Sequence, residues 1–310
     1  MAKIVVSGSL NMDVVAIAPR IPVAGETILG SQFFTTPGGK GANQAYAAAK
    51  LGGDVAMLGR VGEDAFGVQM RKNLADAGCR IDAVRALPGA SGVALIYVSE
   101  RGENSIVVVP GANQLLTAAD IANERDLFDG CAALLLQLET PLETVVAAAQ
   151  RGRALGAHVI LDPAPAPSTP LPHELLEAVD ILTPNETEAA ILAGFAPRPL
   201  TPGEAAAIAL KLQGMGPRTI IVKLGAQGCL LWHGAASTVI AAPEVTAVDT
   251  TAAGDVFNGA LAVALSEGLA LIQACEFAVH ASALSVTRLG AQSSVPMRAE
   301  VDKFQPLRAS

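Results

Sequence analysis

The sequence predicts an α/β protein with a mostly parallel central sheet, covered by helices on both faces, and with a small projecting β-sheet. Short runs of β-branched residues alternate with longer stretches rich in alanine and leucine, a pattern typical of βαβ units. In two places, strand-like runs follow one another directly through turns that contain glycine or proline. The chain has 310 residues, of which 51% are hydrophobic and 16% are charged, so it can bury a large core.

The alternating elements can be placed along the chain, and their connections are long enough for right-handed crossovers. The expected core strands are residues 3–7, 55–58, 133–138, 159–161, 181–183 and 219–223. The expected helices between or after them include residues 42–51, 66–77, 142–155 and 203–212. We also expect a meander at residues 229–233 and 238–241, followed by helices that begin at Gly254 and Leu271. Because no linker interrupts this pattern, residues 1–310 are predicted to form one domain.

The two interruptions of the pattern predict four strands that have no covering helix. They are residues 12–18 with 32–36, and residues 93–99 with 105–109. Such a group of strands is not self-sufficient, so we expect a small sheet that projects from the main body. This discontinuous sheet, drawn from residues 12–37 and 92–110, is predicted to act as a lid or as a contact between subunits.

The charge balance favours a small-molecule partner. The chain has 21 Lys and Arg against 29 Asp and Glu, which gives a formal charge of −8 and a pI of about 5.0. Binding of nucleic acid or of an anionic membrane needs clustered basic residues, so we expect neither partner. The mean hydropathy of +0.42 reflects abundant alanine, because the longest apolar runs are far too short to span a membrane. We find no signal peptide and expect a cytoplasmic protein.

The cysteines and histidines do not form a recognisable metal or catalytic motif. Cys79, Cys131, Cys229 and Cys275 are widely spaced, without a C-x-x-C pair, and are predicted to be reduced core residues. The four histidines are scattered, and neither a metal-binding H-E-x-x-H motif nor a G-x-S-x-G nucleophile elbow is present. Metal-dependent and serine-dependent hydrolysis therefore receive no support.

Polar residues follow the predicted strands with unusual consistency. They are Glu139, Asp162, Asn185, Lys223 and Asp249, the last of these after an expected strand at residues 245–248. Any one of them could be an ordinary polar loop residue. In doubly wound sheets, however, ligands bind beyond the carboxyl ends of the strands, and all five together favour a binding site there.

The segment Asp249-Thr250-Thr251-Ala252-Ala253-Gly254-Asp255 is the strongest single element. Its small residues lead from a strand end into a helix expected to begin near Val256, so exposed N–H groups and the helix dipole would form an anion hole. Ala252, Ala253 and Gly254 would supply this hole, with Asp255 at its mouth. The alternative is that Asp255 is merely the N-cap of the helix.

Two further segments supply candidate ligand-binding residues. The run Pro37-Gly38-Gly39-Lys40-Gly41-Ala42-Asn43-Gln44 leads into a helix, but it matches neither a P-loop nor a dinucleotide fingerprint. Its glycines would let a compact ligand approach the backbone, with Lys40 and Asn43 as donors, although an ordinary turn before a helix remains the alternative. Asn11 and Asp13 share one face of a strand, which suits a pair of vicinal hydroxyls.

These segments resemble the motifs of the ribokinase family of carbohydrate kinases, also called the PfkB family, in order and in spacing. The matching segments are residues 8–13, 38–44, 183–188 and 249–255, and the resemblance covers almost the whole chain. It implies a ribokinase-like three-layer sandwich whose projecting sheet is a lid that closes over the sugar and pairs with a second subunit. Within the family, residues 137–139 and 286–292 resemble the members that phosphorylate ribose.

The resemblance also implies an activity and a role for each matching residue. The activity is transfer of the ATP γ-phosphoryl group to the 5-hydroxyl of D-ribose, with Asp255 as the base that takes the hydroxyl proton. The residues implied to hold the sugar are Asn11, Asp13, Gly39, Lys40, Asn43, Glu139 and Asp255. Those implied to contact ATP are Asn185, Lys223, Leu224, Gly225, Ala226, Gln227, Gly228 and Gly254.

Two cations are implied by the same resemblance. Glu188 would help to position Mg²⁺ through water. A monovalent cation, K⁺, would be bound by Asp249, Thr251, Ser285, Arg288, Gly290 and Ser294, mostly through backbone carbonyls.

Three positions depart from the family pattern, all on the nucleotide side. Lys223 stands where a short hydroxyl residue is more usual, Val279 where Asn or His is common, and Asp162 where Asn often precedes Pro-Ala-Pro-Ala. Lys223 is expected to add an ammonium group near the β- or γ-phosphate.

Three other functions are alternatives to a ribose kinase. The nearest is a kinase of the same fold that acts on 2-deoxyribose, a nucleoside or another sugar. A non-catalytic sugar or nucleotide sensor is disfavoured because a binding protein has no use for Asp255 as a base. An oxidoreductase would need the dinucleotide fingerprint that this sequence lacks.

Overall fold

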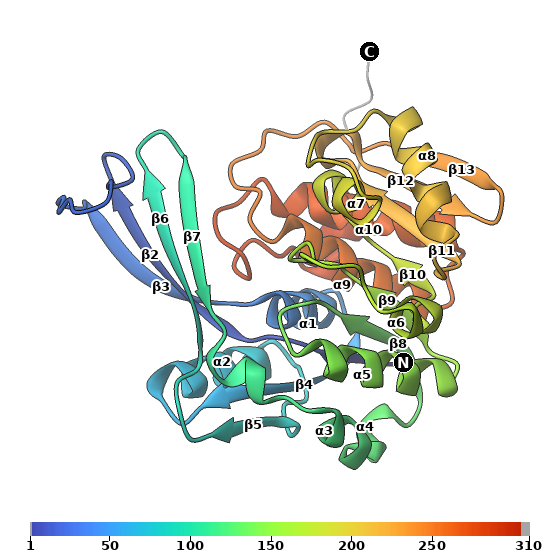
Figure 1. The fold of residues 1–310 in the computed structure, drawn as a ribbon, viewed down its shortest axis with the longest axis horizontal. Helices are drawn as coiled ribbons and strands as arrows, with labels where there is room; N and C mark the ends of the chain where they lie inside the picture. Colours follow the sequence, from blue (N-terminus) through green and yellow to red (C-terminus); the bar gives the residue numbers. More distant parts are fainter. Residues whose placement is uncertain (1, 305–310) are drawn as a thin grey trace.

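Nine strands form the central sheet in the computed structural model, which describes residues 2–304 (Figure 1). Their order is β13-β12-β11-β10-β9-β8-β1-β4-β5, and only β12 and β13 run antiparallel to their neighbours. The mostly parallel sheet predicted from the sequence is therefore confirmed. The strands are β1 Lys3–Ser7, β4 Asp54–Gly62, β5 Val84–Leu87, β8 Cys131–Leu136, β9 His158–Leu161, β10 Ile181–Leu182, β11 Thr219–Lys223, β12 Cys229–His233 and β13 Ala236–Ile240.

Helices cover both faces of this sheet, so the main body has three layers. One face packs against α1 Lys40–Lys50, α2 Ala65–Asp76, α9 Ala253–Ser266, α10 Leu271–Ser285 and α11 Arg298–Lys303. The other packs against α3 Ala118–Asn123, α4 Arg125–Phe128, α5 Leu142–Ala154, α6 His173–Ala178, α7 Glu186–Leu192 and α8 Pro202–Gln213. Alternate residues of β1 pack into the cores on the two faces of the sheet. Ile4 and Val6 pack on the first face, and Val5 packs on the second.

Four strands form a second sheet that projects from the main body (Figure 1). They are β2 Asn11–Ala18, β3 Gln32–Gly38, β6 Gly92–Ser99 and β7 Asn104–Val109, in the order β3-β2-β6-β7. Strand β2 pairs parallel to β6 and antiparallel to β3, and β7 pairs antiparallel to β6. This projecting sheet confirms the small separate sheet expected from the sequence.

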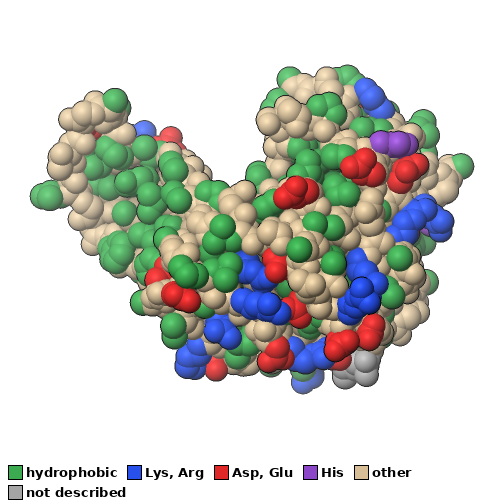
Figure 2. Space-filling view, turned by 60° about the horizontal axis from the view of Figure 1, so that its bottom comes forward, with side chains coloured by type: hydrophobic (Ala, Val, Ile, Leu, Met, Phe, Trp, Pro, Cys, Tyr) green, Lys and Arg blue, Asp and Glu red, His purple; other side chains and the backbone are tan. Residues whose placement is uncertain are grey.

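The projecting sheet leaves apolar side chains exposed, and Figure 2 shows them as a cluster on the arm across from the main body. All six residues of β7 are exposed, and four of them are isoleucine or valine. Soluble surfaces rarely carry so many neighbouring apolar side chains without a partner.

Two features of the region before α9 differ from the sequence-based expectations. Residues 245–248 do not form a strand, because no neighbouring strand pairs with them; Val245, Thr246 and Ala247 line a cavity instead. Helix α9 begins at Ala253, earlier than the expected Val256. Its N-cap is Ala252, which has a left-handed conformation. The sequence analysis also missed the edge strand β5.

The four cysteines are buried and free, as predicted. Two short 3₁₀ helices, η1 Gly111–Leu115 and η2 Gly225–Gln227, complete the described elements. Among residues 2–304, no helix combines the length and the apolar character that a membrane crossing requires.

Candidate functional site

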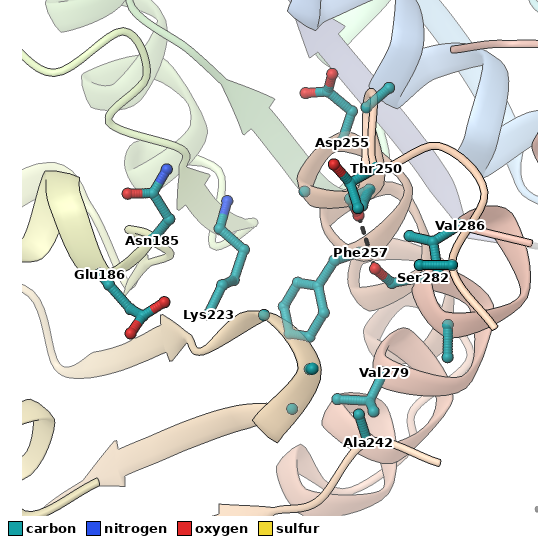
Figure 3. A pocket seen from close by; sticks show the side chains of 18 of the residues that line it. Asn185, Glu186, Lys223, Ala242, Thr250, Asp255, Phe257, Val279, Ser282 and Val286 are labelled. Carbon is teal, nitrogen blue, oxygen red and sulfur yellow. Dashed lines mark hydrogen bonds between the residues drawn. The ribbon is translucent and has the colours of Figure 1, made fainter. Parts of the chain in front are cut away.

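A cavity of about 1120 Å³ lies at the carboxyl ends of the parallel strands, beside the N-terminus of α9 (Figure 3). One end is polar and the other is apolar. Asp255, Lys223 and Asn185 lie at the polar end, and Phe257 and Val279 lie toward the apolar end. A long ligand with one charged end and one flat apolar end would fit such a cavity.

The N-terminus of α9 is shaped to receive an anion. Ala252, its N-cap, has a φ of 59° and is the only non-glycine residue with a positive φ among residues 2–304. An alanine side chain cannot cap the first N–H groups of the helix. Ala253 N donates to Thr250 O at 3.3 Å, whereas the N–H groups of Gly254 and Asp255 remain available to a ligand. Ala252, Ala253 and Gly254 all line the cavity, as an anion hole requires. Asp255 is the third helical residue rather than the N-cap, so the capping alternative is wrong.

Asp255 is a buried carboxylate held by two amides. Its Oδ2 accepts a hydrogen bond of 3.0 Å from Asn43 Nδ2, and its Oδ1 accepts one of 3.1 Å from Gln44 Nε2. Burial raises the pKa of Asp255 to about 6, and the positive charge of Lys40 limits the rise. Asp255 is therefore mostly ionised at neutral pH but holds a proton more readily than an exposed aspartate, as a general base should.

Glu139 joins three elements at the base of the projecting sheet. Its Oε2 accepts from Lys40 N at 3.1 Å, from Asn11 Nδ2 at 3.4 Å and from the Ser9 hydroxyl. Asn11 is also fixed from the other side, because its Oδ1 accepts from Asn113 Nδ2 at 2.8 Å. The start of β2, the start of α1 and the end of β8 therefore meet around one set of polar side chains.

Asp13 lies next to the glycines that precede α1. A Cβ on Gly38 would be only 2.5 Å from Asp13 Oδ2, so the backbone there approaches the carboxylate closely. Burial, with the nearby charges of Glu139 and Asp255, raises the pKa of Asp13 to about 7. A partly buried carboxylate of this kind suits hydrogen bonding to the hydroxyls of a ligand.

Lys40 is the cation of this acidic region. Burial alone would lower its pKa, but attraction by four surrounding carboxylates outweighs burial and raises the pKa above its ordinary value. Those carboxylates belong to Asp255, Asp162, Glu139 and Glu188. Lys40 therefore stays charged, and it lines the cavity together with the residues at the N-terminus of α9.

Asn185 and Glu188 form a capping box at the start of α7. Asn185 Oδ1 accepts from Glu188 N at 2.8 Å, and Glu188 Oε2 accepts from Asn185 N at 2.8 Å. Both residues line the cavity. Burial and the charge of Asp162 raise the pKa of Glu188, whereas Lys223 and Lys40 act in the opposite direction.

The remaining residues proposed for a nucleotide are only partly gathered in the cavity. Lys223, Gly225, Ala226, Gly228 and Gly254 line it. Leu224 and Gln227 do not, and the Leu224 side chain is packed in the core on the second face of the sheet. Contact with Leu224 would therefore have to come from its backbone.

The residues proposed for a monovalent cation lie in the loop before α9, at the end of α10 and in the loop after it, and Asp249 links the two loops. Asp249 Oδ1 accepts from Thr251 N at 2.9 Å, and its Oδ2 accepts from Gly290 N at 2.8 Å. These bonds outweigh the effect of burial and lower the pKa of Asp249. Ser285 and Ser294, on either side of Gly290 in the sequence, are both buried. Arg288 forms an ion pair with Glu300. Within the described residues, no group of three or more His, Cys, Asp or Glu side chains is arranged as a metal site.

Sequence reasoning missed three side chains that the structure places in this network. Gln44 links Asp255 to Asp162, Asn113 holds Asn11, and Gln292 Nε2 donates to Asn43 Oδ1 at 3.0 Å. Gln44 and Gln292 lie in segments 38–44 and 286–292, which were identified from the sequence, so a place for them in the site could have been predicted. Asn113 follows the projecting sheet in an unremarkable Gly-Ala-Asn turn and gave no such signal.

Comparisons with known proteins agree with this geometry. The model of the pfkB family carbohydrate kinases matches residues 1–298. A ribokinase of Schizosaccharomyces pombe is 43% identical over 97% of each chain, and a deoxyribokinase of Salmonella typhi is 38% identical over 98% of this chain and 99% of its own. The structure of Arabidopsis thaliana ribokinase complexed with ribose and ATP covers 98% of this chain and 99% of its own, with a TM-score of 0.89 and 36% identity. This chain belongs to the pfkB family of carbohydrate kinases.

Proposed function

We propose that this chain is an ATP-dependent kinase that phosphorylates D-ribose at O5, giving D-ribose 5-phosphate and ADP. The observation that carries the proposal is the position of Asp255. Its buried carboxylate lies in the first turn of α9, lines the large cavity and accepts hydrogen bonds from Asn43 and Gln44. The sequence relatives named as ribokinases support ribose as the acceptor.

The sugar is proposed to bind where β2, α1 and β8 meet. Asn11, Asp13 and Glu139 offer amide and carboxylate groups there, and Asn43 extends the set toward Asp255. The backbone at Gly39 and the ammonium of Lys40 complete it. A hydroxyl-rich ligand needs this mixture, because each hydroxyl both donates and accepts a hydrogen bond.

Asp255 is proposed to receive the proton of the 5-hydroxyl as that oxygen attacks the γ-phosphorus. Phosphoryl transfer has a loose transition state, so the proton leaves late and a weak base suffices. Asn43 and Gln44 hold both carboxylate oxygens and therefore fix the direction in which the base points. Exclusion of water by the projecting sheet would protect ATP from hydrolysis.

The phosphates are proposed to lie at the N-terminus of α9, with the adenine toward Phe257 and Val279. The N–H groups of the helix and the ammonium groups of Lys40 and Lys223 oppose the negative charge that spreads over the transferred group. The carboxylate-rich lining of the cavity fits Mg²⁺, which Glu188 would hold through water. Mg²⁺ bound with the nucleotide would neutralise phosphate charge.

A monovalent cation, K⁺, is proposed to bind beside Asp249, which ties the loop before α9 to the loop at Gly290. Carbonyl groups at the matching positions would supply most of its ligands, with Thr251, Ser285, Arg288 and Ser294 as the other candidates. Because α9 begins directly after one of these loops, an ordered loop would steady the anion hole.

The projecting sheet is proposed to close over the sugar as a lid and to pair with a second copy of the chain in a homodimer. Its exposed apolar side chains support this proposal, since a partner sheet would bury them.

A second candidate acceptor is 2-deoxyribose, favoured by the 38% identity to a deoxyribokinase. A site that hydrogen-bonds the 2-hydroxyl would leave its own polar groups unpaired against the deoxy sugar, and would therefore disfavour it strongly. The present geometry supports ribose because Asn11, Asp13 and Glu139 form a dense polar set.

An ADP-release assay with Mg-ATP tests the proposal directly. D-ribose, 2-deoxyribose, fructose and adenosine are compared as acceptors, each with and without K⁺. We expect the highest kcat/KM with ribose and a further rise with K⁺. A preference for 2-deoxyribose would assign the second candidate, and ribose binding by calorimetry without turnover of any acceptor would indicate a sensor.

A further inference from the structure

An ion pair is buried in the lining of the cavity. Lys223 Nζ lies 2.9 Å from Asp162 Oδ1, and the two side chains are 13% and 4% exposed. Both residues line the cavity, and each ends a strand of the central sheet or directly follows one. Bringing two charges out of water costs much of what their attraction returns, so such a pair is weak evidence of a stabilising role.

The ammonium group of this pair lies against the N-terminus of α9. Lys223 Nζ is 3.2 Å from the position that a Cβ on Gly254 would occupy. The helix terminus carries partial positive charge, so an ammonium there would be repelled without an anion close by. Asp162 is the anion that pairs with it in the structure, and the carboxylate of Glu188 is a second negative charge that interacts with Lys223.

The two partners differ in their freedom to move. Asp162 is fixed by its backbone, since its N–H donates to Leu136 O at 2.9 Å, and by Gln44 Nε2, which donates to its Oδ2 at 3.1 Å. Lys223 has a flexible four-carbon stem. If the pair separates, the lysine is the partner that moves, and Asp162 keeps a hydrogen bond.

We propose that Lys223 exchanges partners during the reaction: it leaves Asp162 to pair with a phosphate oxygen of the nucleotide at the N-terminus of α9, so that Asp162 limits nucleotide affinity by competing for the ammonium. This inference rests on the proposed function in one respect, namely that the phosphates occupy this end of the cavity. It assigns Asp162 the role of a positioning residue that acts on the nucleotide through Lys223.

The exchange has a consequence that a structural ion pair would not have. Removing the charge of Asp162 frees Lys223 and also removes a repelling carboxylate, so the nucleotide binds more tightly. Removing the charge of Lys223 weakens binding. It also removes most of the benefit of Asp162→Asn, because the ammonium that pairs with Asp162 is gone and only the loss of direct repulsion remains.

Calorimetric titration with ADP, with and without Mg²⁺, tests this on four forms of the chain. These are the natural chain, Asp162→Asn, Lys223→Met and the double variant. We expect Asp162→Asn to tighten ADP binding by at least about threefold, and Lys223→Met to weaken it by about tenfold or more. In the Lys223→Met background, Asp162→Asn should change the affinity by less than about twofold.

The matched control is the exposed pair Lys72 and Asp76, which lies outside the cavity. Lys72→Met and Asp76→Asn make the same charge changes and should leave ADP affinity unaltered. If Asp162→Asn fails to fold, as judged by its melting curve, Asp162→Ser replaces it.

The proposal is overturned if Asp162→Asn leaves affinity unchanged or weakens it, or if its gain is equally large without Lys223. Absence of ADP binding by the natural chain is a different result, because it would overturn the proposed place of the nucleotide phosphates in this cavity. Binding of ADP by the natural chain without coupling between the two residues overturns the partner exchange alone.

Discussion

Asn43 and Asp255 are joined by a hydrogen bond of 3.0 Å between an amide nitrogen of α1 and a carboxylate oxygen of α9. The other end of the same amide accepts from Gln292 Nε2 at 3.0 Å, so the orientation of Asn43 is fixed. Gln292 is held in turn by Asn73 on α2. The direction of the proposed base is therefore set by a chain of amides that crosses from the outer helix to the centre of the site.

Asp255→Asn should reduce kcat by about 10²- to 10⁴-fold, because an amide cannot accept the proton of the attacking hydroxyl. Ribose binding should remain measurable, since an amide of the same shape can still hydrogen-bond. The measurements are kcat in the ADP-release assay and the ribose Kd by calorimetry. Asp76→Asn, an exposed change of the same kind, serves as the control. A kcat close to that of the natural chain would remove Asp255 from the mechanism.

Asn43→Ala should weaken ribose binding by about 1 to 3 kcal/mol, because the hydroxyl that it holds would be left without its partner. It should also lower kcat, since Asp255 loses one of its two amide donors. Gln292→Ala removes only the group that orients Asn43, so its effect on ribose affinity should be smaller. The KM and Kd for ribose test both variants. An unchanged ribose affinity in Asn43→Ala would show that this helix start does not face the sugar.

The positions of Glu139, Asp162, Asn185 and Lys223 could be anticipated from the sequence because of a general property of parallel sheets. The carboxyl ends of all the parallel strands meet at one edge, so polar residues placed after successive strands must converge there. Periodicity also located the projecting sheet, since each of its two pairs of strand-like runs is joined without an intervening helix and none of the four has a covering helix.

What the sequence could not provide were contacts decided by packing between distant segments. Asn113 holds Asn11 across 102 residues, and no local pattern distinguishes it from other loop asparagines. The left-handed conformation of Ala252 could not be predicted from the sequence either, because alanine has no preference for that conformation. The segment at residues 245–248 has the composition of a strand, but it finds no neighbouring strand with which to pair.

The activity should fall as the pH drops below about 6. Burial raises the pKa of Asp255 to about 6, and only its ionised form can accept a proton, so kcat/KM for ribose is lost as that carboxylate becomes protonated. Asp162 is one of the charges that raise this pKa, so Asp162→Asn should move the acidic limb to lower pH. The same change should have little effect on the pKa of Asp13. That pKa is raised to about 7 by burial and by the charges of Glu139 and Asp255.

A pH profile of kcat/KM for the natural chain and for Asp162→Asn checks this, with Asp76→Asn as the control for net charge. An acidic limb that stays in place in Asp162→Asn would contradict the electrostatic link between the two carboxylates.

A charged residue on the projecting sheet should dissociate the proposed homodimer. Ile106 and Val107 lie next to each other on β7, point to opposite faces of the sheet and are both about half exposed. Burial of apolar area stabilises such an interface, and a buried unpaired lysine would oppose it. Sedimentation of Ile106→Lys and Val107→Lys should therefore give the monomer mass for at least one of them. Val68→Lys, an exposed change on α2, should leave the mass unaltered, and a dimer in all three variants would exclude the projecting sheet as the interface.

Gly39→Ala should lower ribose affinity at least about tenfold, because the new methyl group would lie in the backbone of β2. Gly39 has a φ of 90°, and a Cβ there would be 2.6 Å from Asn11 N, so α1 and β2 would have to separate exactly where the sugar is proposed to bind. Gly52→Ala is the matched control, since its φ of 93° brings similar strain but its Cβ would meet no atom within 4 Å. We expect Gly52→Ala to reduce the free energy of unfolding by about 1 to 2 kcal/mol without changing the ribose Kd. Equal and small effects of the two variants on ribose affinity would show that the close approach of Gly39 to Asn11 is not required for sugar binding.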